Sequence, residues 1–332
     1  MVDKRDNLVY YSRMVKDEVL KILESNRERF TSGQELATAL GVTRTAVWKA
    51  VNALISDGHD VEAVSSKGYR LTDESDVLTA AGIQARMKNA CEVRVYDCVE
   101  STNKTAKLAA VEGVAANTII VANEQTGGKG RRGRSFFSPK GTGVYFSVVL
   151  KPHVSAEKSV LVTTAAAVAA ADAIESLTGK TAQIKWINDI YVDGRKCVGI
   201  LTEAIFDYES GGVDSVIVGT GVNVTTTNFP DEIADRAGSV GKISRNALVA
   251  AICDRLIELA NGLPSDEHLA EYRKKCFVLG KRIHIIGKDC EYDAEALNVD
   301  DNGGLVVRTD DGDVVTLSNE EVSIRVRGDE QA

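Results

Sequence analysis

The sequence predicts a multidomain α+β protein with an N-terminal winged helix-turn-helix, a central domain built on a mixed sheet, and a small C-terminal β-barrel. Three features of the 332-residue chain predict this class. The N-terminal part has short helices followed by a two-stranded wing. The centre joins strands by hairpins more often than by helical crossovers, and the end alternates short strands with turns. We place the domains at residues 1–75, 76–275 and 276–332.

The N-terminal domain carries the start and stop signals of a helix-turn-helix. Ser32 suits an N-cap, Glu35 follows three residues later to complete a capping box, and Gly41 ends that short helix. Thr43 caps a second helix with an apolar face. Two short alternating segments then flank the sequence SSKG, which predicts a β-wing with Lys67 at its tip.

The second helix and the wing present side chains that suit phosphates and base edges. We therefore predict DNA binding by Thr43, Arg44, Thr45, Trp48, Lys49 and Lys67. Any two short helices joined by glycine give a similar pattern, and residues 1–75 carry 11 Lys/Arg against 12 Asp/Glu, so there is no bulk basic patch. A protein-interaction role for this domain therefore stays open.

The central domain mixes two kinds of element. Strands are expected at residues 93–99, 117–124, 143–150, 182–188, 196–206 and 215–224, and helices at 103–113, 156–179 and 245–262. The sequence VDGRK between two strands predicts a hairpin with Asp-Gly at its turn. In the C-terminal domain, strands are expected at residues 281–287, 290–300, 303–309, 313–319 and 321–326.

The composition limits the class of protein. A net charge of -8 argues against indiscriminate nucleic-acid binding, although it permits one small DNA-reading module. Six scattered cysteines without a CxxC pair predict neither a disulfide framework nor a zinc site. The longest apolar run, residues 160–174, is interrupted by polar residues, and the N-terminus lacks the apolar core of a signal peptide. We expect a cytoplasmic protein with reduced thiols, no membrane partner and no metal ligand that can be assigned.

One loop, GGKGRRGR at residues 127–134, is strongly cationic in this acidic chain. Gly128, Gly130 and Gly133 satisfy the GxGxxG spacing of a dinucleotide site, but a strand and not a helix follows them. The loop also lacks the P-loop pattern. Its glycines let backbone N–H groups approach an anion, which Lys129, Arg131, Arg132 and Arg134 would neutralise. The alternative is a solvated basic loop tip.

Three further stretches carry polar groups at element ends. In KWINDIYVDGRKCVGILTE, Lys185 ends a strand and Gly199 and Thr202 make the next strand small enough for a ligand. ESTNKTAKLAA begins a helix, and its hydroxyl and amide groups could hold a polar heterocycle. GTGVNV, residues 219–224, ends a strand with glycines and Asn223, which suits close approach of a purine.

Together and in this order, these stretches resemble the biotin protein ligases, specifically the bifunctional type that is also a biotin-dependent transcriptional repressor. The resemblance covers essentially the whole chain and implies a ligase domain of the biotin/lipoate ligase type with a small SH3-like barrel after it. The family loop GRGRRG is here GKGRRG, and the family motif KWPND is here KWIND. The family's STN triplet falls at residues 101–103, and its glutamine at Gln125.

The resemblance implies a two-step reaction. Biotin and ATP form biotinyl-adenylate, which then acylates a lysine of biotin carboxyl carrier protein, and Mg²⁺ accompanies the ATP through ligands that we do not assign. The implied biotin-binding residues are Ser101, Thr102, Asn103, Gln125, Lys129, Gly130, Arg131 and Lys185. The implied ATP and adenylate residues are Gly128, Arg131, Arg132, Lys185, Asn188 and Asn223. Lys185 and Arg131 are the expected catalytic residues.

The resemblance also implies operator DNA as a partner of the N-terminal domain and a ligand-promoted homodimer. Two alternatives stay open: a ligase without a transcriptional role, and a ligand-sensing regulator without catalysis. A lipoate-ligase-like specificity is a further alternative, although lipoate ligases usually lack this arginine loop.

The chain departs from the family pattern at two positions. Ile187 replaces the usual proline, which leaves the turn after Trp186 less fixed. Lys129 stands where arginine is common, which keeps the charge and loses the bidentate fork. We expect Lys129→Arg to slow adenylate dissociation modestly. Dissociation rates of labelled adenylate from the two proteins test this, and equal rates would contradict it.

Overall fold

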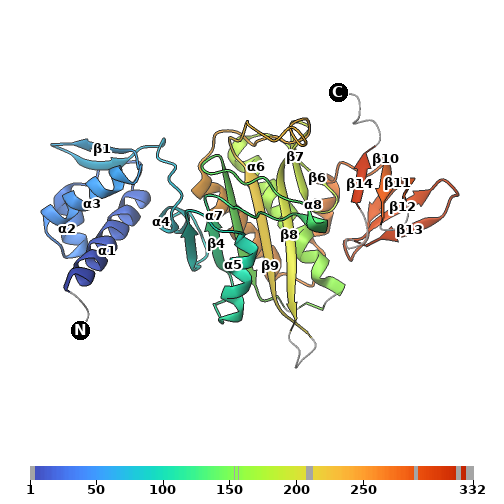
Figure 1. Ribbon diagram of the computed structural model, residues 1–332, viewed down its shortest axis with the longest axis horizontal. Helices are drawn as coiled ribbons and strands as arrows, with labels where there is room; N and C mark the ends of the chain where they lie inside the picture. The colour runs from blue at the N-terminus through green and yellow to red at the C-terminus, as the bar shows by residue number, and fades with distance from the viewer. Residues whose placement is uncertain are drawn as a thin grey trace. The chain divides into compact units, whose positions relative to one another are not determined.

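The computed structural model describes residues 4–152, 154–155, 157–206, 212–287, 291–318 and 323–326 (Figure 1). The chain divides into two compact units. One contains Met1–Ala90 with Ser244–Ala250, and the other contains Cys91–Ile243 with Ala251–Ala332. The two units are described separately below.

The first unit is a winged helix-turn-helix, as predicted. The helices α1, α2 and α3 lead into a two-stranded antiparallel wing, and a short helix α4 follows it. Their bounds are α1 Lys4–Ser25, α2 Gly33–Leu40, α3 Arg44–Ser56, β1 Val61–Val64, β2 Gly68–Leu71 and α4 Ala80–Gln84.

The predicted caps are confirmed, with one difference. The Ser32 hydroxyl accepts the backbone N–H of Glu35, the Thr43 hydroxyl accepts that of Ala46, and Gly41 ends α2 with a left-handed φ of 63°. The capping box forms only in half, because the Glu35 carboxylate pairs with Arg29 at 2.6 Å. An exposed arginine competes successfully for this carboxylate since its charge attracts it more than a neutral N–H does.

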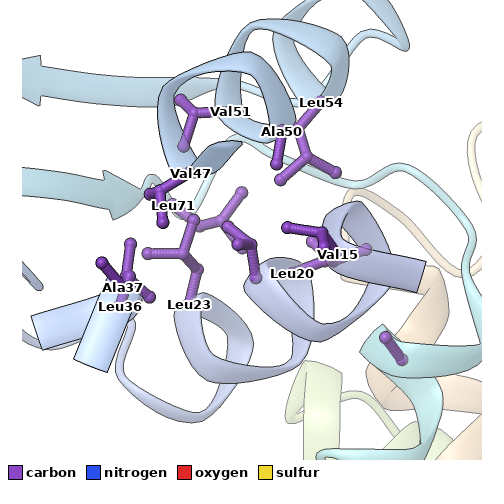
Figure 2. Close-up of a cluster of buried hydrophobic side chains, with 12 residues drawn as sticks. Val15, Leu20, Leu23, Leu36, Ala37, Val47, Ala50, Val51, Leu54 and Leu71 are labelled. Atoms are coloured by element: carbon purple, nitrogen blue, oxygen red, sulfur yellow. The ribbon is translucent and has the colours of Figure 1, made fainter. Parts of the chain in front are cut away.

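The core of this unit lies where α1, α2 and α3 meet (Figure 2). Leu20 and Leu23 of α1 pack with Leu36 of α2 and with Val47 and Leu54 of α3. These five side chains are at most 3% exposed. The spacing of three and four residues that predicted each helix therefore also places its apolar face in the core.

The second unit is built on a seven-stranded mixed sheet with the order β3-β4-β5-β9-β8-β7-β6. Only β3 and β4 are parallel, and every other neighbouring pair is antiparallel. The predicted mixed sheet is confirmed. The strand bounds are β3 Val93–Tyr96, β4 Thr118–Ala122, β5 Gly143–Leu150, β6 Ala182–Lys185, β7 Asp189–Val192, β8 Arg195–Phe206 and β9 Val213–Asn223.

Helices cover both faces of this sheet. Helix α5, Thr102–Val111, packs on β4, β5 and β9, whereas α6, Val160–Thr178, packs across β6 to β9 on the other face (Figure 1). Two more helices are α7, Arg245–Asn261, whose residues up to Ala250 belong to the first unit, and α8, His268–Lys275, which packs against α6. The predicted helix at 156–179 begins later, at Val160, after a 3₁₀ turn over Glu157–Ser159, and residue 156 lies outside the described residues.

Helix α6 is long and apolar enough to cross a membrane by length and composition, but 72% of its apolar window is buried inside the protein. Its residues from Leu161 to Ala171 are all buried. Alanine on every side lets the helix lie close to both the sheet and α8. The apolar composition of α6 is therefore explained by its place in the core.

The C-terminal part of this unit forms a five-stranded antiparallel sheet with the order β13-β12-β11-β10-β14. Its strands are β10 Arg282–Ile286, β11 Glu291–Val299, β12 Leu305–Thr309, β13 Val314–Leu317 and β14 Ser323–Val326. The five predicted strands are confirmed, while residues 290, 319, 321 and 322 of those predictions lie outside the described residues. Among the described residues β13 and β14 do not pair, so closure of this sheet into a barrel is not confirmed.

The described cysteines, Cys91, Cys98, Cys197, Cys253 and Cys276, are free thiols, as predicted. Cys290 lies outside the described residues.

A buried histidine makes the stability of this unit depend on pH. His268 lies 2.8 Å from the Thr164 hydroxyl, and burial lowers its pKa from 6.5 to about 4. The unfolded chain binds this proton below about pH 6.5 while the fold does not, so stability falls as pH drops from 6.5 toward 4. The loss reaches up to about 3 kcal/mol for this group.

We expect His268→Gln to remove most of this dependence. The thermal midpoint of wild type should fall between pH 7 and pH 5 by several degrees more than that of the variant. Equal falls in the two proteins would show that His268 does not carry the effect. The control variant is Gln34→Ala, because the Gln34 side chain is exposed and does not titrate. Asn246→Gln is less suitable, because Asn246 is buried.

Candidate active site

A cleft of about 1140 Å³ lies on the sheet face that carries α5. More cations than carboxylates line the cleft. The lining cations are Lys129, Arg131, Arg134, Lys185, Arg195, Lys196, Arg236 and Arg325, and the lining carboxylates are Asp189, Asp193 and Asp235. In a chain of net charge -8 this concentration favours an anionic ligand. Among the described residues no group of three or more His, Cys, Asp or Glu side chains could hold a metal ion.

One end of the cleft is a cluster of hydroxyl and amide groups at the start of α5. The Thr102 N–H and hydroxyl both donate to the Gln125 side-chain oxygen, at 2.9 and 3.2 Å. The Ser147 hydroxyl on β5 lies 2.8 Å from Thr102 Oγ1 and 2.7 Å from Asn103 Oδ1. Ser101 occupies the N-cap position of α5 but makes no side-chain cap bond. Its hydroxyl is therefore not used by the helix.

Asn103 is held from several sides. Its Nδ2 donates to the Leu201 carbonyl at 3.2 Å and to the Glu203 carboxylate at 2.7 Å, both on β8. A Cβ atom at Gly219 of β9 would overlap the Asn103 amide. Glycine at position 219 therefore makes the space that the amide occupies.

The floor of the cleft is an aromatic ring on two glycines. Gly199 and Gly221 are directly paired across β8 and β9. A Cβ at Gly199 would lie 2.9 Å from the Phe136 ring, and one at Gly221 would overlap it. The ring also meets Tyr145 edge to face, with centroids 6.3 Å apart. Because both strands have glycine here, the Phe136 ring lies flat on them in a fixed position beside the polar cluster.

The cationic loop is a tight hairpin and not a helix start, as predicted. Phe136 N donates to the Gly128 carbonyl at 2.9 Å, and Gly130 N donates to the Arg134 carbonyl at 2.7 Å. A single 3₁₀ turn, Arg131–Gly133, forms the tip, where Arg132 is left-handed with φ 56°. A Cβ at Gly128 would lie 2.7 Å from the Phe136 carbonyl, so the two sides of the hairpin approach closely only with glycine there.

Arg131 points from this tip into the cleft. Its guanidinium donates to Asn188 Oδ1 at 3.2 Å. Burial lowers its pKa, Arg132 and Arg134 lower it further, and the nearby Asp189 carboxylate opposes them. Since an arginine stays charged in a protein, the result is a half-buried cation for which an added anion would relieve electrostatic strain.

Two lysines enter the cleft from the opposite side. Lys185 ends β6, and its Nζ lies 5.8 Å from the centre of the Tyr191 ring. Lys196 is the second residue of β8, and its Nζ pairs with Asp189 at 2.6 Å. The register pairs Lys185 with Asp189 and Asp189 with Gly199, so these positions form one row that runs toward the Phe136 ring.

The far end of the cleft contains Asn223 and a second aromatic pair. Asn223 donates its Nδ2 to the Gly238 carbonyl at 3.1 Å, while its buried Oδ1 has no partner among the described residues. The rings of Phe137 and Phe229 meet edge to face at 6.3 Å, and both line the cleft. An unpaired acceptor beside aromatic rings suits a flat heterocycle with an amino group.

The structure brings most of the predicted ligand-binding residues together in this cleft: Ser101, Thr102, Asn103, Gln125, Lys129, Gly130, Arg131, Lys185, Asn188 and Asn223. Gly128 and Arg132 do not line it. Arg132 instead donates to the Ile286 carbonyl of the C-terminal sheet at 3.0 Å.

Sequence reasoning missed Ser147, Phe136 and Lys196. Ser147 lies in the apolar strand 143–150, and Phe136 is one of two adjacent phenylalanines, so neither gave a signal of its own. Lys196 lies in the VDGRK hairpin, where a lysine is typical of a solvated turn. No signal in the sequence points to it, because only the strand register brings Lys196 beside Asp189 of the KWIND motif.

In the first unit, the predicted DNA-binding residues are all exposed on α3 and the wing: Thr43, Arg44, Thr45, Trp48, Lys49 and Lys67. Trp48 is 57% exposed. Seven described cations of this unit pair with carboxylates, namely Lys16, Lys21, Arg27, Arg29, Arg70, Arg86 and Arg245. Arg44, Lys49 and Lys67 have no carboxylate partner among the described residues. These three unpaired cations therefore all lie on α3 and the wing.

Comparison with known proteins places both units. Residues 16–70 match the HTH domain family, and residues 95–223 match the Biotin/lipoate A/B protein ligase family. The chain is 33% identical to the bifunctional ligase/repressor BirA of Bacillus subtilis over 320 residues, which cover 90% of this chain and 95% of that protein. It is 26% identical to BirA of Escherichia coli over 304 residues, which cover 89% and 93%.

The fold comparison agrees. The biotin protein ligase from Aquifex aeolicus in complex with biotin and ATP superposes with a TM-score of 0.61 at 26% identity, over 71% of this chain and 99% of that chain. Because a relative above 30% identity is matched over nearly its whole length, this chain belongs to the bifunctional ligase/repressor group of the biotin/lipoate protein ligase family.

Proposed function

We propose that this chain is an ATP-dependent biotin protein ligase that also represses transcription in response to biotin. The observation that carries the ligase function is the cleft itself, where a hydroxyl and amide cluster, an aromatic floor and eight cations meet. That combination suits a small neutral heterocycle with a carboxylate tail next to a nucleotide phosphate.

In the first step, a biotin carboxylate oxygen attacks the α-phosphorus of ATP, supplied as its Mg²⁺ complex, and pyrophosphate leaves. Two anions must approach each other, so cations have to offset their repulsion. We assign Arg131 and Lys185, joined by Lys196, to this role. Asp189 holds the Lys196 ammonium at 2.6 Å, which fixes its position before substrates bind.

Biotin recognition belongs to the polar cluster. Ser101, Thr102, Asn103 and Gln125 offer donors and acceptors for the ring system, and Phe136 offers it an apolar surface. Asn188 orients Arg131, and Asn223 with its unpaired Oδ1 accepts from the adenine amino group. Lys129 and Gly130 close the loop over the adenylate. Gly128 and Arg132, which do not line the cleft, would support the hairpin instead.

In the second step, the neutral ε-amine of an acceptor lysine attacks the acyl carbon of biotinyl-adenylate, and AMP leaves. The acceptor is a lysine of biotin carboxyl carrier protein. Incubation with labelled biotin, ATP and a carrier domain tests the whole reaction. Labelling of the carrier domain only when ATP is present is expected, while no labelling would refute the ligase function. Competition by lipoate would separate the two substrate classes.

The repressor function rests on the three open cations of α3 and the wing. A homodimer would place two such surfaces on successive half-sites of an operator. Residues 201–206 of β8 extend past the end of β7, so among the described residues this half of β8 is paired only with β9. We propose this free strand edge as the dimer contact, because unpaired N–H and C=O groups there can pair with a second copy.

A gel shift with the promoter of the organism's own biotin-synthesis genes tests this function. Binding should require biotin and ATP together, since the adenylate promotes the dimer. DNA binding without biotin and ATP, or no DNA binding in their presence, would refute the biotin-dependent regulation. The chain would then be a ligase without this form of regulation.

The salt dependence of that binding can be predicted from the open charges. Three cations per protomer give six in a dimer, so the slope of log K against log salt should be about -5. Lys67→Ala, which removes two of the six charges, should reduce the steepness by about 2. Lys21→Ala, whose lysine already pairs with Glu18, is the matched control and should leave the slope unchanged. A slope near zero in wild type would exclude phosphate contacts by these residues.

A further inference from the structure

The wing of the first unit is held against the connection between α1 and α2. Thr31 N donates to the Tyr69 carbonyl at 2.8 Å, and Tyr69 N donates to the Thr31 carbonyl at 2.9 Å. The connection therefore pairs with β2 through a single antiparallel β-bridge between Thr31 and Tyr69. A Cβ at Gly68 would overlap the Thr31 carbonyl, and Gly68 has φ 110°, so only glycine permits this approach.

Phe30 precedes this contact, and its ring lies beside two wing cations. The Lys67 ammonium is 5.5 Å from the ring centre, and the Arg70 guanidinium carbon is 4.8 Å from it. Both distances are within the range of cation–π attraction. Phe30 itself is only half-buried and does not belong to the apolar core cluster of this unit.

The two cations differ in what else they contact. Arg70 pairs with Glu62 across the wing at 2.7 Å, so its charge is offset. Lys67 has no carboxylate partner among the described residues, so its charge is held in place by the ring without being neutralised. A long lysine side chain on an exposed wing would otherwise be free to turn, and ordering it costs conformational entropy on binding.

We propose that Phe30 is a positioning residue for DNA binding. Its ring holds the Lys67 ammonium at the tip of the wing, where a DNA phosphate contacts it. Arg70, which Glu62 holds in place, contacts the same ring and keeps it in position. This inference rests on the proposed DNA-binding function and adds to it a residue outside the recognition helix and the wing tip. The aromatic face of Phe30, and not its apolar volume, holds the Lys67 ammonium.

The test uses the full-length protein with biotin and ATP on the promoter fragment described above. Phe30→Leu should weaken binding roughly tenfold, since two rings are lost per dimer. Phe30→Tyr, which keeps the ring, should bind like wild type. Phe30→Leu combined with Lys67→Ala should bind no more weakly than Lys67→Ala alone, because the ring acts through that lysine.

Two readouts separate positioning from general destabilisation. The salt slope should become less steep in Phe30→Leu although no charge is removed, and the thermal midpoint of the first unit should stay the same. A lowered midpoint with an unchanged slope would mean that Phe30 is merely structural. If wild type binds the DNA and Phe30→Leu binds it equally well, the role of Phe30 is refuted and the DNA-binding function stands. Failure of wild type to bind would overturn the DNA-binding function and this inference with it.

Discussion

Replacing Lys196 by alanine is expected to reduce biotinyl-adenylate formation by roughly 10²–10⁴-fold, with little change in the fold. Lys196 is fixed by Asp189 at 2.6 Å and lies beside Gly199, where the aromatic floor begins. Its ammonium is therefore preorganised where a carboxylate tail leaving the polar cluster would meet the phosphates. Removal also takes from the half-buried Asp189 carboxylate its ion-pair partner, so its charge repels both substrates more strongly.

The variant Lys185→Ala is the necessary comparison, because both its place at a strand end and the family resemblance pointed to Lys185. Lys185 lies at the end of the same row, further from the Phe136 ring, with its ammonium over Tyr191 at 5.8 Å. We expect a loss for this variant too, and a larger one for Lys196→Ala. Lys140→Ala, whose exposed lysine pairs with Asp97 outside the cleft, is the matched control.

Biotin-dependent exchange of labelled pyrophosphate into ATP measures the first step without the carrier protein. Lys196→Arg keeps the charge and should recover part of the lost rate. Full exchange activity in Lys196→Ala would refute the role assigned to that lysine. Equal activity of Lys185→Ala and wild type would remove Lys185 from the first step while leaving Lys196 in place.

The sequence was sufficient where local chemistry decides the structure. Ser32, Gly41 and Thr43 have few alternatives to capping, and the caps form as predicted. The loop at residues 127–134 is followed by Pro139, two glycines and the apolar run 144–150, which favours a strand, and the hairpin into β5 follows. In each case the relevant partners lie within about ten residues along the chain.

The sequence was insufficient where strand register decides. Lys196 and Asp189 both lie in a stretch whose polarity is typical of a surface hairpin, and only the pairing of Asp189 with Gly199 brings them to the cleft. Phe136 is indistinguishable from a core residue until Gly199 and Gly221 are seen beneath it. Glycine in a strand indicates that something approaches closely, but the sequence does not say what.

The same limit applies to electrostatics. Residues 1–75 are near neutral by count, which weakened the DNA-binding prediction. The structure shows that carboxylates neutralise several cations away from α3 and the wing, for example Lys16 by Asp57 and Arg27 by Glu24. A near-neutral domain can therefore still present a local positive surface, since only its unpaired charges act on a partner.

Gly219→Ala is expected to raise the KM for biotin by roughly 10- to 100-fold with the KM for ATP nearly unchanged. The added methyl group overlaps the Asn103 amide, whose helix is fixed by its packing on β5 and β9. The amide must turn away from Leu201, Glu203 and Ser147. Each lost or unsatisfied bond costs about 1–3 kcal/mol, and the ring-binding cluster loses a member.

If Gly219 acts through Asn103, the two substitutions should not be additive. Asn103→Ala alone should raise the KM for biotin by a similar factor, and the double variant should be no worse than Asn103→Ala, because the methyl group then fills the space that the amide left. Gly262→Ala is the matched control, since a Cβ there meets only the Leu259 carbonyl at 3.4 Å. Initial rates at varied biotin and saturating ATP decide the matter. A multiplicative loss in the double variant, or an unchanged KM in Gly219→Ala, would mean that the strand glycine serves the backbone and not the biotin site.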